Sequence, residues 1–178
     1  MIKIDLSPNA LAERKLTSSL LEINSTTQKY GLFLTEAIAR EIAAARGKSL
    51  SDNGRIDFSP DPIVRLIKAF SESRYITQED FSWVISEVIE LFYFLRNEVE
   101  DVLSDDDMIS EMLVVFTETC AGSIEIMQSK GVEKIVRKYR FGDTQIWSDY
   151  ENCGRIDYVD PENKRLEDWW EHGETWRE

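Results

Sequence analysis

The chain has 178 residues, enough for one domain with a sizeable core and a short appendage. Its formal net charge of −13 argues against nucleic acid and anionic membrane surfaces as partners, because both are bound mainly through clustered Lys and Arg. Hydrophobic residues make up 42% and charged residues 31% of the chain, a balance that excludes an intrinsically disordered protein.

Two cysteines, Cys120 and Cys153, are too few for a disulfide framework or a zinc site. The first residues lack a basic region followed by an apolar run, so we expect no signal peptide. The longest apolar run, residues 91–95, is too short to span a bilayer. We therefore expect a cytoplasmic protein.

Capping signals and helical periodicity predict an all-α fold, a bundle of six or seven helices. Ser7 and Pro8 begin a first helix that Gly31 stops. Thr35 caps the next helix, and Gly47 is expected to end it. A later helix, which carries Pro62 in its first turn, precedes the central one. Ser104, followed by three aspartates, is expected to cap the helix after the central one.

The central element is predicted over residues 77–103. Its apolar residues recur at spacings of three and four, and Ile89 and Phe94 widen that face to more than half of the girth. A helix this apolar is expected to be enclosed by its neighbours. The main face consists of Phe81, Val84, Ile85, Val88, Leu91, Phe92, Leu95, Val99 and Val102.

Two pentapeptides are near copies: residues 54–58 read Gly-Arg-Ile-Asp-Phe, and residues 154–158 read Gly-Arg-Ile-Asp-Tyr. Residues 3–6 are a looser third copy. One interpretation is two or three short edge strands that pair into a small sheet beside the bundle. The other is coincidence, and the sequence leaves both open.

A basic cluster lies near the end of the predicted bundle and consists of Lys134, Arg137, Lys138 and Arg140. Such a run either binds a phosphate or an acidic partner, or neutralises nearby acids at a helix C-terminus. We favour the second reading, with the acidic C-terminal segment as the source of the acids.

The composition changes after residue 142, which predicts a helical domain over residues 1–142 and an acidic tail over 143–178. The tail has 11 acidic residues against four Lys or Arg, yet it holds four of the five tryptophans. Disordered tails are poor in aromatic residues, so we expect this tail to dock on the bundle or on a second subunit. Its expected partner-binding residues are Trp169, Trp170 and Trp176, with Tyr158 behind them, and packing within the chain is the alternative.

The tail also contains a partial match to a calcium loop. Asp149, Asp157 and Asp160 occupy positions one, nine and twelve of a twelve-residue loop, and Gly154 occupies the turn position. Cys153, however, replaces an oxygen ligand. Calcium or magnesium binding is therefore an alternative hypothesis, and no other cofactor is indicated.

Catalytic patterns are missing from the sequence. His172 is the single histidine, and neither a Gly-x-Ser-x-Gly elbow nor a phosphate-binding glycine loop occurs. The leading hypothesis is a non-enzymatic interaction or regulatory module. A divalent-cation-binding protein and a small-molecule pocket inside the bundle are the alternatives.

Several short pieces between residues 17 and 142 resemble an uncharacterised family of small acidic helical proteins from anaerobic Gram-positive bacteria, a domain of unknown function. The resemblance implies a bacterial cytoplasmic protein in which the turn over residues 54–58 is a structural feature and not a coincidence. It implies no activity and no cofactor. The pieces are Tyr30-Gly31-Leu32, Leu34-Thr35-Glu36, residues 54–58, Tyr75-Ile76 with Gln78-Glu79, and Arg140-Phe141-Gly142.

Overall fold

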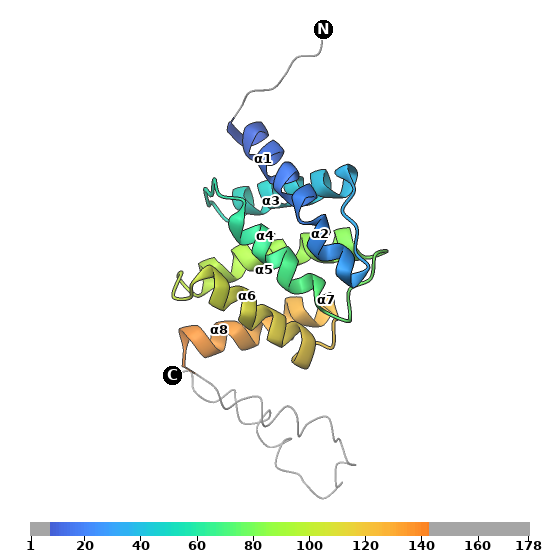
Figure 1. The fold of residues 1–178 in the computed structure, drawn as a ribbon. Helices are drawn as coiled ribbons and strands as arrows, with labels where there is room; N and C mark the ends of the chain where they lie inside the picture. The colour runs from blue at the N-terminus through green and yellow to red at the C-terminus, as the bar shows by residue number, and fades with distance from the viewer. Residues whose placement is uncertain (1–7, 143–178) are drawn as a thin grey trace, which may run out of the picture. The chain divides into compact units, whose positions relative to one another are not determined.

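The computed structural model describes residues 8–142, and this part of the chain is all-α, as the sequence predicts (Figure 1). Its elements are α1 (Pro8–Glu22), α2 (Asn24–Thr27), the 3₁₀ turn η1 (Gln28–Tyr30), α3 (Glu36–Asp52), α4 (Asp61–Ser71), α5 (Phe81–Glu98), α6 (Asp105–Val114), the π-helical turn η2 (Val115–Thr119), α7 (Ile124–Ile126), the π-helical turn η3 (Met127–Gly131) and α8 (Val132–Arg140).

Side chains at the expected positions cap two of the long helices. Thr35 Oγ1 accepts a hydrogen bond from the backbone N–H of Ile38 at 3.2 Å, and Ser104 Oγ accepts one from Asp107 at 3.2 Å. Gly31 ends η1 in the left-handed conformation, with φ of +78°. These three predicted helix boundaries are confirmed.

The predicted end of the second helix at Gly47 is wrong, because α3 continues to Asp52. Glycine within a helix costs about 1 kcal/mol relative to alanine. Packing of nearby residues offsets that cost, since Arg46 and Ser49 are buried in the body of the fold.

The predicted central helix 77–103 is α5, which is shorter at both ends. Residues before it form a turn in which the Thr77 N–H donates to Asp80 Oδ1 at 2.8 Å. After it, Glu100 and Asp101 both have φ of +54°, a left-handed conformation that ends the helix. Val102, predicted to face the core, is consequently 67% exposed.

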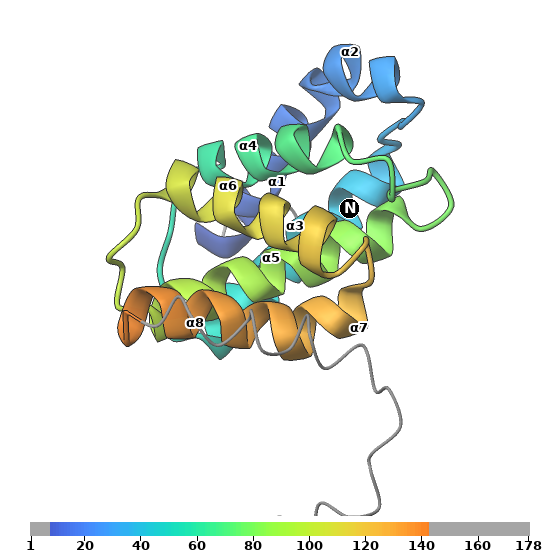
Figure 2. The ribbon, with the colours of Figure 1, turned by 90° about the horizontal axis from the view of Figure 1, so that it is seen from below.

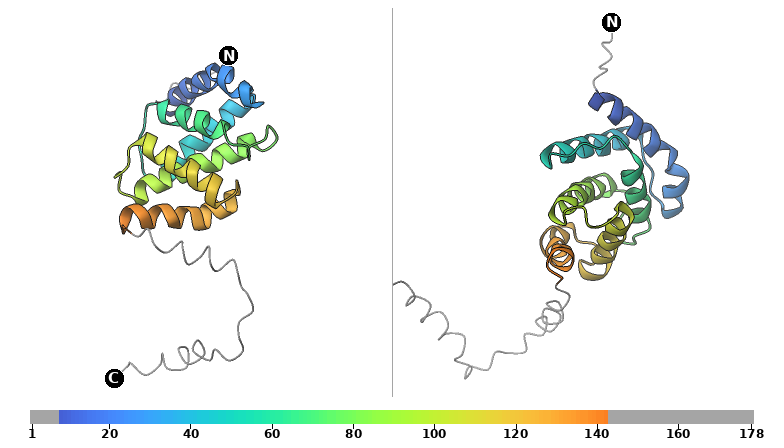
Figure 3. Two further views of the ribbon diagram at one scale, coloured as in Figure 1. Left: turned by 60° about the horizontal axis from the view of Figure 1, so that its bottom comes forward. Right: turned by 90° about the vertical axis from the view of Figure 1, so that its left-hand side faces the viewer.

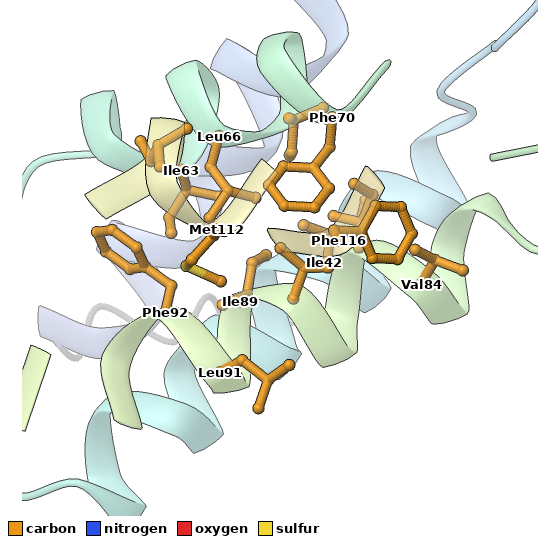
Figure 4. Packing of buried hydrophobic residues seen from close by; sticks show 14 of the residues in the cluster. Ile42, Ile63, Leu66, Phe70, Val84, Ile89, Leu91, Phe92, Met112 and Phe116 are labelled. Carbon is orange, nitrogen blue, oxygen red and sulfur yellow. The ribbon is translucent and has the colours of Figure 1, made fainter. Parts of the chain in front are cut away.

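The helices form two layers with the core between them. Helices α3, α5 and α8 lie side by side in one layer, and α4 and α6 form the other (Figures 2 and 3). Helix α5 contacts α3, α4, α6, α7 and α8, so the expected enclosure of the central helix is confirmed. Figure 4 shows how side chains of α5 meet those of α4, α6 and η2, among them Ile63, Leu66, Phe70, Ile89, Phe92, Met112 and Phe116.

The predicted edge strand over residues 54–58 is wrong, because residues 8–142 contain no strand. Its proposed partners, residues 3–6 and 154–158, lie outside the described part of the chain. Residues 54–59 instead form a loop. The side chain of Arg55 bonds to Asp101, just after α5, and the side chain of Asp57 forms an ion pair with Arg46 of α3.

No helix in the described part of the chain is both long enough and apolar enough to cross a membrane.

Candidate functional site

The loop of residues 54–59 begins at a sharp end to α3. The N–H of Asn53 donates to Ser49 O at 3.1 Å, and the N–H of Arg55 donates to Leu50 O at 2.8 Å. Gly54 lies between them with φ of +61°, a conformation that glycine adopts without steric cost. The Asn-Gly pair therefore turns the chain back towards α5, as its turn signal predicts.

A buried arginine of α3 anchors the middle of this loop. The Arg46 side chain is only 5% exposed, and its Nη2 donates to the carbonyls of Asp57 at 2.8 Å and Ser59 at 2.9 Å. The same nitrogen lies 3.3 Å from Asp57 Oδ2, which makes an ion pair. A buried charge is tolerated when it is paired and hydrogen-bonded in this way.

Tyr93 of α5 joins the anchor from the other side. Its hydroxyl accepts a hydrogen bond from Arg46 Nε at 3.2 Å and donates one to Asp57 Oδ2 at 3.2 Å. Burial raises the pKa of Tyr93 to about 12, while the Arg46 charge acts in the opposite direction. Tyr93 is therefore a neutral phenol that ties helix, arginine and loop together.

A second arginine fixes the beginning of the loop. Arg55 Nη1 donates to Asn97 Oδ1 at 2.7 Å, and its Nη2 donates to both carboxylate oxygens of Asp101, at 2.8 and 3.0 Å. Hydrogen bonding from Arg55, with help from Arg96, lowers the pKa of Asp101. A bidentate pair of this kind defines orientation as well as adding stability.

The apolar side chains of the loop are largely exposed. Ile56 is 81% exposed and Phe58 is 70% exposed. The charged residues that alternate with them, Arg55 and Asp57, bond to the helical body instead. The usual arrangement of a half-buried extended segment is the reverse, with apolar side chains inside and charged ones outside. The hydrogen bonds and ion pairs of Arg55 and Asp57 thus hold the loop in a conformation that leaves Ile56 and Phe58 exposed.

A cavity of about 310 Å³ lies behind the loop, between α1 and α3. Its lining mixes the charged groups of Glu13, Arg46, Arg55 and Asp57 with apolar surface, which includes parts of the exposed Ile56 and Phe58. Of the guanidinium nitrogens of Arg46, Nη1 makes none of the hydrogen bonds that tie the loop. The cavity has room for a small polar molecule.

Residues 8–142 contain no cluster of three or more His, Cys, Asp or Glu side chains that would hold a metal ion. The predicted metal ligands Asp149, Asp157 and Asp160 lie outside the described residues, so the cation hypothesis stays a prediction. The same holds for the predicted partner-binding residues Tyr158, Trp169, Trp170 and Trp176.

The basic cluster of α8 pairs with carboxylates of the helical body. Lys138 Nζ lies 2.8 Å from Glu111 Oε2, and Arg137 Nη2 lies 2.7 Å from Glu133 Oε1. Arg140 Nη1 lies 3.4 Å from an oxygen of Glu98 in α5. Each of these three charges therefore has a carboxylate partner within residues 8–142.

Sequence reasoning missed the site residues that matter most in this arrangement. Neither Arg46 nor Tyr93 stands in a recognisable motif, so the sequence does not single them out as site residues. A signal was present in the alternation of residues 55–58, which predicts two opposite faces but not which of them is buried.

A model described as a family of unknown function, DUF6323, matches residues 19–145. The match includes the whole 54–59 loop and both arginine anchors. No curated protein and no solved structure matches the chain.

Proposed function

The chain belongs to the DUF6323 family, a family of unknown function, and we propose that it is a non-enzymatic protein-interaction module that binds through its 54–59 loop. The observation that carries the proposal is the exposure of Ile56 and Phe58 on a loop whose polar side chains are fixed to the helices. A partner with an apolar pocket would bury both side chains.

The energetics favour a binding role for these two residues. Burying a large apolar side chain that was exposed contributes about 1.5–3 kcal/mol, so Ile56 and Phe58 together offer roughly 3–6 kcal/mol to a complex. That is the size of an interface hot spot. In the free protein the same exposure is unfavourable, which is the signature of surface kept for a partner.

The anchors lower the cost of binding. Ordering a loop at an interface costs about 0.5–1.5 kcal/mol per rotamer-rich side chain, in addition to the backbone entropy. Arg46 and Arg55 hold the backbone of the loop before any partner arrives, through hydrogen bonds to Asp57 O, Ser59 O and the side chain of Asp101. Most of the conformational entropy of the loop is thus lost when the protein folds and does not oppose binding.

The charge of the body supports a protein partner over nucleic acid. The chain carries a net charge of −13, and Arg137, Lys138 and Arg140 of α8 are paired with carboxylates. A phosphate backbone would require such groups to be available. We propose a cytoplasmic location for the module.

A photo-cross-linking experiment tests the proposal. The full chain carries p-benzoylphenylalanine in place of Phe58 and is irradiated in the cells that produce it. Phe141, which is 69% exposed, provides the matched position for a control. We expect one protein to cross-link from position 58 and not from position 141, and the yield to fall when Arg46→Met releases the loop.

Two results would contradict the proposal. Identical cross-linked proteins from positions 58 and 141 would mean that exposure alone, and not the anchored loop, decides the contact. Cross-links from position 58 only to a second copy of the chain would make the loop a self-association contact.

A further inference from the structure

Helix α5 carries an exposed stripe on the side away from the core. Trp83, Glu87, Glu90 and Phe94 follow one another at spacings of four, three and four, so they share one face of the helix. Trp83 is 50% exposed and Phe94 is 40% exposed. The sequence pattern placed Phe94 in the core, and its exposure leaves a helix face with large aromatic side chains at both ends.

Three members of this stripe, Glu87, Glu90 and Phe94, line a groove of about 380 Å³. Leu91 and Phe94 of α5 form its apolar floor, and Leu91 projects from the side of α5 opposite to Phe92 (Figure 4). The walls come from both neighbouring helices, with Asn53 at the end of α3 and Val132 at the start of α8. Helix α5 lies between α3 and α8 (Figure 3), and residues at the ends of both neighbours complete the groove over it.

The rim of the groove is acidic. Asp52, Glu87 and Glu90 line it, and none of the three forms an ion pair within residues 8–142. Glu87 accepts one hydrogen bond, from Gln128 Nε2 at 2.7 Å, which is a neutral donor. Three carboxylates around an apolar floor therefore present negative charge without compensation from this part of the chain.

We propose that this groove binds a basic amphipathic helix of a protein partner. An apolar groove between helices accepts the apolar face of another helix, and the carboxylate rim selects Lys and Arg beside that face. On α5 the groove extends from Glu87 to Phe94, a span of about 11 Å, which matches about two turns of a helix. The occupant differs from α8 of a second copy, whose bases already pair with Glu98, Glu111 and Glu133.

A designed peptide tests the proposal on the full chain. The probe is a fluorescein-labelled 14-residue peptide with Leu at heptad positions a and d and Lys elsewhere, and its twin carries Glu in place of Lys. Fluorescence anisotropy measures both. We expect the Lys peptide to bind, and Phe94→Ser to weaken it at least about tenfold.

A charge exchange separates the groove from the general charge of the protein. Glu87→Lys with Glu90→Lys should abolish binding of the Lys peptide and create binding of the Glu peptide. The control Glu79→Lys with Glu118→Lys changes the net charge equally at exposed positions outside the groove. It should leave the affinity within about twofold.

Several outcomes would overturn the inference. If the Lys peptide does not bind the unaltered chain, the groove has no such ligand. Equal losses of affinity in the groove variant and in the control would mean that only the net charge of the protein matters. A dimer in sedimentation velocity that Phe94→Ser dissociates would show that a second copy occupies the groove. Ile56→Ser with Phe58→Ser should not change peptide affinity, so this test fails or succeeds separately from the proposed function.

Discussion

Replacing Arg46 by methionine tests whether this side chain anchors the 54–59 loop. The substitution keeps most of the apolar volume of a side chain that is 5% exposed, and it removes all of the donors. The carbonyls of Asp57 and Ser59, the Asp57 carboxylate and the Tyr93 hydroxyl each lose a hydrogen-bond or ion-pair partner. The centre of the loop then keeps only the hydrogen bond from the Tyr93 hydroxyl to Asp57 Oδ2.

The expected magnitude follows from the burial of the pair. Removing one member of a buried ion pair costs about 3–5 kcal/mol, because the other charge stays behind without a partner. The Asp57 side chain is 23% exposed, so water relieves part of that penalty. We expect the free energy of unfolding to fall by about 3 kcal/mol and the Tm to fall by roughly 10 °C.

Urea unfolding followed by circular dichroism measures the change. Arg40 on the same helix supplies the matched control, because its ion pair with Glu36 is exposed, at 71% and 64%. Arg40→Met should cost less than about 0.5 kcal/mol. Equal losses for the two variants would refute the anchor. A double variant with Asp57→Asn should lose less than the sum of its single changes, since the two side chains interact.

Four further substitutions probe other parts of the fold. Because burial raises the pKa of Tyr93 to about 12, its contribution to stability is complete below about pH 10 and is lost as the pH rises from about 10 to about 12. Tyr93→Phe should flatten the pH profile of unfolding there, and unchanged profiles would contradict the assignment. Gly122→Ala should cost well over 1 kcal/mol by denaturant titration, since φ is +82° and the new Cβ would lie 2.3 Å from Tyr75 Cβ. Gly31→Ala, with φ of +78° and open space, should cost only about 1 kcal/mol, and equal costs would remove the steric argument. Ser104→Ala should cost about 1 kcal/mol by removing the cap of α6, and a neutral result would show that the cap is dispensable.

Periodicity predicted the helical body well because burial repeats along a helix. The face of α5 from Phe81 to Leu95 is buried as expected, and the caps at Thr35 and Ser104 form the predicted bonds. Helix ends depend on tertiary contacts as well, which is why α3 passes Gly47 and why α5 stops before Val99.

The candidate site was less accessible to sequence reasoning. The alternation of residues 55–58 predicts two faces, but a buried arginine opposite the loop decides that the charged face turns inward. Arg46 lies in an alanine-rich helix and nothing next to it in the chain indicates burial. Phe94 fits an apolar face by spacing, yet α3 and α8 leave it beside a groove. Both features depend on residues far apart in the sequence.

The most direct test of the account is the unfolding free energy of the full chain with Ile56→Ser and Phe58→Ser. If both side chains are held in solvent for a partner, the double variant should unfold within about 0.5 kcal/mol of the unaltered protein. A loss of about 3 kcal/mol or more, as for large side chains removed from a core, would show that the chain itself covers them. That result would contradict the proposed binding loop.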